Sequence, residues 1–274
     1  MMAADNPAVE LRAVNKRFSG AERPLFDSFS LHVEAGETLA IVGPSGCGKS
    51  TLLNMVALLE TPDRGQVVHD GTIRRAEDVG SLPIGYIFQR DALLPWATVE
   101  ENFIVAAECR RQRRKEVLTR ARAFLARVGL SDVEHRHPHR LSGGQRQLVA
   151  LAQSLVLEPG LLLLDEPFAH LDFPTKLSLE SELVALGHAQ RPDSPRPITT
   201  ILVTHDIAEA VVVADRLLVV GGYPAVPTRV LRELRIDVAP GDRDPVAMRE
   251  GAALPHYFQL AWDAMREAQG GRLS

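Results

Sequence analysis

The 274-residue chain has little of what marks secreted, membrane-spanning and nucleic-acid-binding proteins. It has two cysteines, too few for a disulfide framework, which fits a reducing compartment. No stretch reaches the roughly 18 apolar residues that a membrane-spanning helix needs, so any membrane role requires a partner chain. The first residues carry neither a basic nor an apolar segment, and we expect no signal peptide. With 31 basic against 35 acidic residues, the composition predicts no nucleic-acid partner.

The hydrophobic pattern predicts an α/β protein. Alternating apolar residues at 9–14 and 29–33 indicate half-buried antiparallel strands. Continuous apolar runs, separated by helical patterns, indicate the buried strands of a parallel sheet. These runs are residues 38–42, 161–164, 198–203 and 217–220, and a shorter strand is expected at 84–88.

The order of these patterns predicts a core that is interrupted by helices. Residues 1–91 form its first part, 92–157 an inserted helical lobe, and 158–226 the remainder. Residues 227–274 lose regular rhythm and are expected to be a tail. A terminal helix at 257–268 would carry Phe258, Ala261, Trp262 and Met265 on one face.

Residues 43–50, Gly-Pro-Ser-Gly-Cys-Gly-Lys-Ser, form a complete phosphate-binding loop between a predicted strand and a predicted helix at 49–59. Glycines let the backbone wrap phosphates, and the helix N-terminus adds positive potential. Lys49 supplies a charge for the β- and γ-phosphates, and the Ser50 hydroxyl is a ligand for Mg²⁺. We expect Cys47 to be a small filler residue rather than a thiol activated by the helix. The expected phosphate-binding residues are Gly43, Pro44, Ser45, Gly46, Cys47, Gly48, Lys49, Ser50 and Thr51.

Polar residues follow three of the predicted strands, where ligands bind in open α/β sheets. Asp165 and Glu166 follow the run at 161–164; Asp165 can hold Mg²⁺ through a water, and Glu166 can orient or deprotonate the attacking water. His205 ends the next strand and can donate to the γ-phosphate. Gln89 ends the strand at 84–88 and can reach the metal and the attacking water. The predicted catalytic residues are therefore Glu166, His205 and Gln89, and the predicted metal ligands are Ser50, Gln89 and Asp165.

A second glycine-rich helix start, Leu-Ser-Gly-Gly-Gln at 141–145, is one that a lone ATPase does not need. Together with the phosphate loop and the carboxylates, it resembles the signature of the nucleotide-binding subunit of an ATP-binding cassette (ABC) transporter. The resemblance covers about residues 9–225, and Leu171–Asp172 is one of the matching segments within this range. It implies a P-loop NTPase (RecA-like) core with an antiparallel β subdomain and an inserted α-helical subdomain.

The resemblance also implies ATP and Mg²⁺ as cofactors, with Phe18 stacked on the adenine. It implies a head-to-tail dimer with a second copy or a homologous subunit, in which Ser142 and Gly144 contact the γ-phosphate held by Lys49 of the other subunit. The signature residues expected at that nucleotide are Ser142, Gly143, Gly144 and Gln145.

Residues 93–99, Leu-Leu-Pro-Trp-Ala-Thr-Val, are similar to bacterial importer ATPases for nitrate, sulfonates and taurine. This implies ATP-driven uptake of a small solute through a separate permease, with a solute-binding protein acting indirectly. The subunit would lie peripherally on the cytoplasmic face of the plasma membrane. Trp96 is either a docking residue for a permease helix or a core aromatic. The basic run 110–115 is either a solvated helix face or a contact for anionic lipids.

Two alternatives remain. A soluble ABC ATPase not coupled to transport, acting on DNA or ribosomes, would need coiled-coil arms or two tandem cassettes. This chain has one phosphate loop, one signature and no heptad run. A degenerate cassette that binds ATP without hydrolysis is disfavoured, because Glu166 and His205 are both present. The transported solute does not follow from the sequence.

Overall fold

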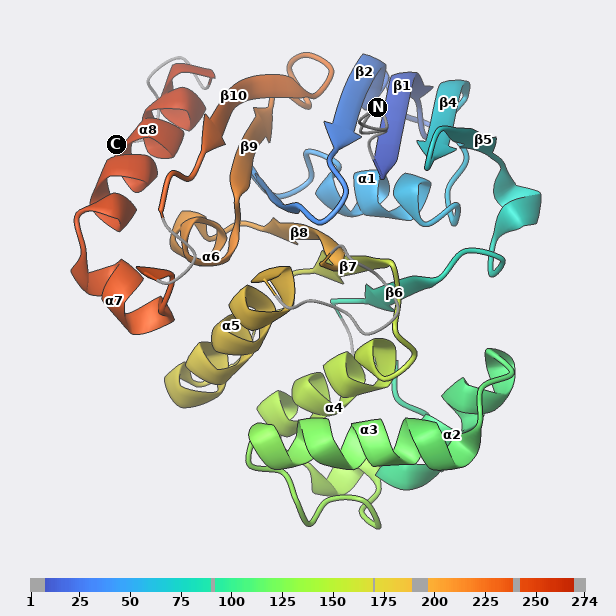
Figure 1. Ribbon diagram of the computed structural model, residues 1–274. Coiled ribbons are helices and arrows are strands. Elements are labelled where there is room, and N and C mark those ends of the chain that lie inside the picture. Colours follow the sequence, from blue (N-terminus) through green and yellow to red (C-terminus); the bar gives the residue numbers. More distant parts are fainter. Residues whose placement is uncertain (1–7, 90–91, 170, 189–196, 239–241, 269–274) are drawn as a thin grey trace, which may run out of the picture.

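The computed structural model describes residues 8–89, 92–169, 171–188, 197–238 and 242–268, and their strands form two sheets (Figure 1). The smaller sheet is antiparallel, in the order β2-β1-β4-β5. Its strands are β1 (Val9–Lys16), β2 (Phe26–Val33), β4 (Arg64–His69) and β5 (Thr72–Arg74). The alternation at 9–14 and 29–33 therefore predicted β1 and β2 correctly, whereas β4 and β5 were not predicted.

The larger sheet has the order β10-β9-β3-β8-β7-β6. β10 pairs antiparallel with β9, and the other neighbours are parallel. The strands are β3 (Thr38–Val42), β6 (Ile84–Ile87), β7 (Leu161–Asp165), β8 (Thr199–Thr204), β9 (Arg216–Gly221) and β10 (Arg229–Arg235). Because every residue of β3, β7, β8 and β9 is buried, these strands read as continuous apolar runs.

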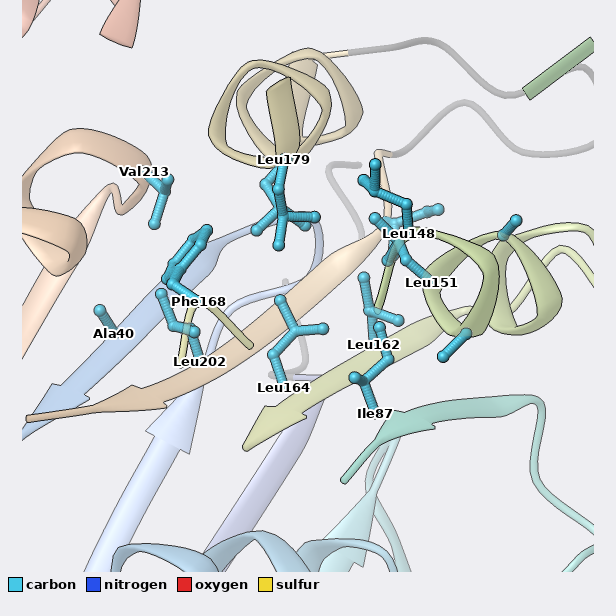
Figure 2. Packing of buried hydrophobic residues seen from close by; sticks show 14 of the residues in the cluster. Ala40, Ile87, Leu148, Leu151, Leu162, Leu164, Phe168, Leu179, Leu202 and Val213 are labelled. Atoms are coloured by element: carbon cyan, nitrogen blue, oxygen red, sulfur yellow. The ribbon is translucent and has the colours of Figure 1, made fainter. Parts of the chain in front are cut away.

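Alternate leucines of β7 contribute to two different hydrophobic cores, as the period of a strand requires. Leu161 and Leu163 belong to the core that α1 (Lys49–Val56) forms with the smaller sheet. Leu162 and Leu164 face the opposite core, where Leu151 of α4 (Gly143–Leu155) lies close to the sheet (Figure 2). The strand that carries Asp165 is thus held from both faces.

The helices α2 (Val99–Cys109) and α3 (Arg114–Arg127) pack together with α4 below the larger sheet, where Figure 1 shows them in green. Thr98 caps the N-terminus of α2. Its hydroxyl accepts from the Glu101 N–H, and the Glu101 carboxylate accepts from the Thr98 N–H. The fold confirms the expected class: a P-loop NTPase core with an antiparallel β subdomain and an inserted helical subdomain. None of the helices in the described part of the chain has the length and apolar character to span a membrane.

The residues after 227 include parts of the core. The strand β10 was not predicted. The helix α8 (Ala253–Ala268) confirms the predicted terminal helix at 257–268, although it packs on the core instead of forming a tail. β10 extends the larger sheet, and α8 packs against α6 (Ile207–Val213), β9 and β10. A short helix, α7 (Pro245–Glu250), precedes α8 and packs against α5 (Phe173–His188). Ala261 is fully buried in α8 but Phe258 is 39% exposed, so the predicted apolar face is only partly right.

Candidate nucleotide site

The phosphate loop joins the buried end of β3 to the first turn of α1, and two of its glycines have no room for a side chain. A Cβ at Gly43 would lie 2.3 Å from the Val220 carbonyl oxygen. Gly48 has φ +95°, and a Cβ there would lie 2.7 Å from the Phe26 ring. The loop therefore needs glycine at these positions for its conformation as well as for phosphate access.

Lys49 is buried, and its Nζ donates to the carbonyl oxygens of Gly43 at 2.8 Å and Pro44 at 3.2 Å. The ammonium group thus lies across the loop that it would serve. Cys47 is fully buried, and burial raises the pKa of its thiol. The burial of Cys47 therefore favours its interpretation as a filler residue over that of a thiol activated by the helix N-terminus.

Ser50 and Asp165 meet at the carboxyl edge of the larger sheet. The Ser50 hydroxyl donates to Asp165 Oδ1 at 3.0 Å, although the two residues are 115 positions apart. Burial raises the pKa of Asp165, and the neighbouring Glu166 raises it further, while Ser50 and Lys49 act against this. A hydroxyl and a buried carboxylate are hard oxygen donors that fit Mg²⁺, which also keeps waters and substrate phosphates as ligands. No group of three or more His, Cys, Asp or Glu in the described residues could hold a metal ion by itself.

Glu166 and His205 form a pair beside this site. His205 Nδ1 lies 2.8 Å from Glu166 Oε2; the glutamate side chain is 13% exposed and the histidine 66%. Glu166 has φ +50°, an unusual conformation for a residue with a side chain, and its N–H donates to the Val203 carbonyl at 2.9 Å. Backbone strain of this kind concentrates at functional sites. It directs this carboxylate towards the end of β8.

A cavity of about 360 Å³ opens between the phosphate loop and its neighbours. Gln89 and Glu166 line it on one side, and Phe18, which is 44% exposed, lines it on another. Arg23 and Tyr223 also line the cavity, and the sequence analysis missed both. Tyr223 had a signal: β9 is parallel to β3, so the residues that follow β9 lie at the same edge as the phosphate loop.

The signature segment lies elsewhere, at the start of α4. The Ser142 hydroxyl accepts from the Gln145 N–H at 3.2 Å, and Gln145 Oε1 accepts from the Ser142 N–H at 3.0 Å. The segment lines a separate cavity, the signature cavity, together with Asp172. Among the residues that the structure describes, none lines both this cavity and the one at the phosphate loop. Within one chain, the structure does not bring the signature to the predicted phosphate site.

Two surface expectations have clear outcomes. Trp96 is 74% exposed, so it is not a core aromatic; the buried residues of its segment are Leu93, Ala97 and Val99. In the basic run, the Arg110 guanidinium donates to the carbonyls of Gly80 and Leu82 at 3.0 and 2.9 Å. Arg110 therefore ties α2 to the segment before β6, which neither interpretation of the run anticipated.

The sequence and fold of this chain are similar to those of known proteins. Residues 26–169 match the family described as "ABC transporter". The chain is 43% identical over 271 residues to the aliphatic sulfonates import ATP-binding protein SsuB of Cupriavidus necator, covering 98% of this chain and 83% of that one. It is also 43% identical over 215 residues to the sulfate/thiosulfate import ATP-binding protein CysA of Bordetella parapertussis, covering 77% and 58%. Its fold is similar to the dimeric post-hydrolysis state of the ATP-binding cassette MJ0796 bound to ADP and Pi. That TM-score is 0.72 at 28% identity, covering 84% of this chain and 100% of that one.

Proposed function

The chain belongs to the ABC transporter family, and we propose that it is the ATP-hydrolysing subunit of an importer for a small solute of the sulfonate, taurine or nitrate class. One observation carries the catalytic part. The Ser50–Asp165 and Glu166–His205 contacts lie at one edge of the larger sheet, next to the phosphate loop. The importer part is supported by the SsuB and CysA relatives, which are named as import ATP-binding proteins.

The phosphate loop holds the triphosphate of ATP in this proposal. Lys49 turns from the loop carbonyls to the β- and γ-phosphates, because a phosphate oxygen is the better acceptor for an ammonium group. Ser50 and Asp165 would hold Mg²⁺, which would supply positive charge to neutralise the charge that develops on the phosphates. Phe18 stacks on the adenine at the mouth of the cavity.

Glu166 orients and deprotonates the water that attacks the γ-phosphate. Its Oε2 lies 2.8 Å from His205 Nδ1. When ATP is bound, His205 donates to the γ-phosphate instead and releases this oxygen for the water. Gln89, which is exposed at the edge of the cavity, completes the contacts to the metal and the water.

The site is completed in a head-to-tail dimer, because each chain keeps its signature away from its own phosphate loop. Ser142, Gly143, Gly144 and Gln145 then contact the nucleotide of the other subunit. We also propose a separate permease, which Trp96 contacts, and a solute-binding protein that acts through it. The subunit accordingly sits on the cytoplasmic face of the membrane. In this proposal residues 92–157 form the inserted helical part, and residues 1–91 and 158–226 together with β10 and α8 form the core.

The test separates catalysis from binding. Glu166→Gln should lower ATP turnover by about 10²–10⁴-fold, because only the proton acceptor is lost, and should leave ATP affinity within about twofold. Lys49→Ala should instead weaken ATP affinity itself. Glu116→Gln, at an exposed carboxylate of α3, is the matched control and should change neither quantity. Turnover by Glu166→Gln at the wild-type rate would show that another group activates the water.

A further inference from the structure

A second cavity, of about 460 Å³, lies in the smaller sheet between residues 58–62, which follow α1, and the β4–β5 hairpin. We call it the hairpin cavity. Its apolar wall includes Leu58 and Val67, which are 5% and 3% exposed, and Ile73. Two cations, Arg74 and Arg75, line it as well. The role proposed above for the chain uses none of these residues.

Arg74 is the feature of this cavity that lacks an explanation. Its Nε is buried and has no hydrogen-bond partner among the described residues. A buried donor without a partner is rare, because it loses its bond to water and gains nothing in exchange. The guanidinium also lies close enough to the buried His69 for its charge to lower the pKa of that histidine, although burial is the larger cause. Arg74 also lines the cavity, so the rest of its guanidinium can meet an acceptor there.

The acidic residues of the cavity leave this cation available. Glu60 forms an ion pair with Lys16. Glu77 is exposed on the surface. The lining therefore offers a guanidinium beside an apolar wall, and this combination selects an anionic group attached to a hydrocarbon body.

We propose that the hairpin cavity binds a small organic anion, with its acidic head on Arg74 and an aliphatic body against the apolar wall. The cavity is also linked to the nucleotide site by a short path. Lys16 Nζ forms an ion pair with the Glu60 carboxylate and donates to the Thr61 carbonyl at 2.8 Å. The same ammonium group lies 5.5 Å from the centre of the Phe18 ring. An occupant that shifts residues 60–61 therefore moves the cation that supports Phe18, and occupancy changes nucleotide affinity.

The binding test uses the full chain with its phosphate loop saturated with ADP, so that this loop cannot take the probe. The probe is 1-hexanesulfonate, measured by calorimetry, and hexylamine and 1-hexanol are the charge and polarity controls. We expect one site with a Kd on the order of 1 mM, typical of a ligand of this size, and at least about tenfold weaker binding of both controls.

Two variants assign the site. Arg74→Met keeps an unbranched apolar stem and removes the guanidinium, and it should weaken hexanesulfonate binding at least about tenfold. Arg64→Met is the matched control, since Arg64 is exposed on the neighbouring strand β4 and does not line the cavity; it should bind as the wild type does. Unchanged binding by Arg74→Met, or no binding by the wild type up to about 20 mM, overturns the proposal. Thermal unfolding of each variant shows that it is folded.

The linkage has its own readout. Hexanesulfonate should change the ADP affinity of the wild type and not that of Arg74→Met. An equal change in both proteins would mean that the sulfonate competes at the phosphate loop, and it would refute the linkage. Neither measurement depends on ATP hydrolysis, so failure here is distinguishable from failure of the importer assignment.

Discussion

Lys176→Met should destabilise the protein, because Lys176 compensates the charge of a buried carboxylate, that of Glu209, close to His205. Its Nζ lies 2.7 Å from Glu209 Oε1, and Glu209 is 7% exposed on α6, four residues after His205. Asp206, which caps α6, lies 3.5 Å from the same ammonium group. The other Glu209 oxygen accepts from the Thr204 hydroxyl at 2.5 Å. Without Lys176, two carboxylates face each other with no cation between them.

The size of the loss follows from burial. Removing one partner of a buried ion pair costs about 3–5 kcal/mol. The Lys176 side chain is 20% exposed, and Thr204 keeps its bond to Glu209, so part of the charge stays compensated. We therefore expect about 2–3 kcal/mol at about pH 8, a large share of the 5–15 kcal/mol that stabilises a typical domain.

The loss should depend on pH, and its sign can be worked out. Burial raises the pKa of Glu209 above its ordinary value of 4.5, and Lys176 is the main group that lowers it again. In the variant this pKa rises further. A carboxyl group with a higher pKa in the folded than in the unfolded state stabilises the fold at low pH, and this contribution is lost as pH rises through the folded pKa. The deficit of the variant should therefore shrink as pH falls towards 4.5.

Urea unfolding of the wild type, Lys176→Met and Lys176→Arg at about pH 8 and pH 5.5 measures both effects. Lys176→Arg keeps a cation and should lose much less stability. A deficit of Lys176→Met below about 0.5 kcal/mol, or one that is equal at the two pH values, would refute the reasoning.

Three further predictions concern binding surfaces. Ser142→Arg should leave ATP affinity of the isolated chain unchanged and prevent ATP-dependent dimerisation, as measured by light scattering, while Thr119→Arg on exposed α3 should dimerise normally. Trp96→Ala should shift the Tm by less than about 2 °C and leave basal turnover intact, because the ring is 74% exposed. Stimulation of turnover by the permease should be lost. Loss of basal turnover in this variant would contradict the role of Trp96 in docking. Tyr223→Ala should weaken ATP binding about fivefold by calorimetry, as expected for a lost aromatic contact of about 1 kcal/mol; equal weakening for inorganic triphosphate would show that the ring does not serve the base.

The phosphate loop was predictable because its chemistry is local. Eight consecutive residues carry the glycines, the lysine and the hydroxyl, and the flanking strand and helix follow from their apolar patterns. Asp165 and Glu166 were predictable for a related reason, since both follow a buried strand and the carboxyl ends of parallel strands share one edge. The proximity of Ser50 and Asp165 follows from the same rule, since both residues lie at that edge of the sheet.

The edge strands β5 and β10 escaped prediction because their side chains mostly face water. In β10 the charged residues Arg229, Arg232, Glu233 and Arg235 hide the period of a strand, and no residue of this strand is fully buried. The helix predicted at 49–59 ends early for a similar local reason: α1 stops at Val56, and Leu58 has φ +63°.

Pairs between distant helices lie beyond sequence reasoning of this kind. Glu180 on α5 is fully buried, and its Oε1 accepts from Arg249 of α7 at 2.6 Å, 69 residues later. Neither residue belongs to a motif, and from the sequence alone each is expected to be a charged side chain on the surface. The pairing arises only because α7 packs on α5, which depends on β10 and α8 belonging to the core.

The two glycines of the signature support the proposed dimer in different ways. Gly144 is explained within the chain, because a Cβ there would lie 2.9 Å from the Thr175 side chain on α5. Gly143 is not: a Cβ at this position would meet nothing within 4 Å, and its backbone has no positive φ. A glycine at the start of a helix gives up stability relative to alanine without any gain inside the chain. The remaining reason for glycine is close approach by something from outside, and the nucleotide of a second subunit, bound head-to-tail, fits that position.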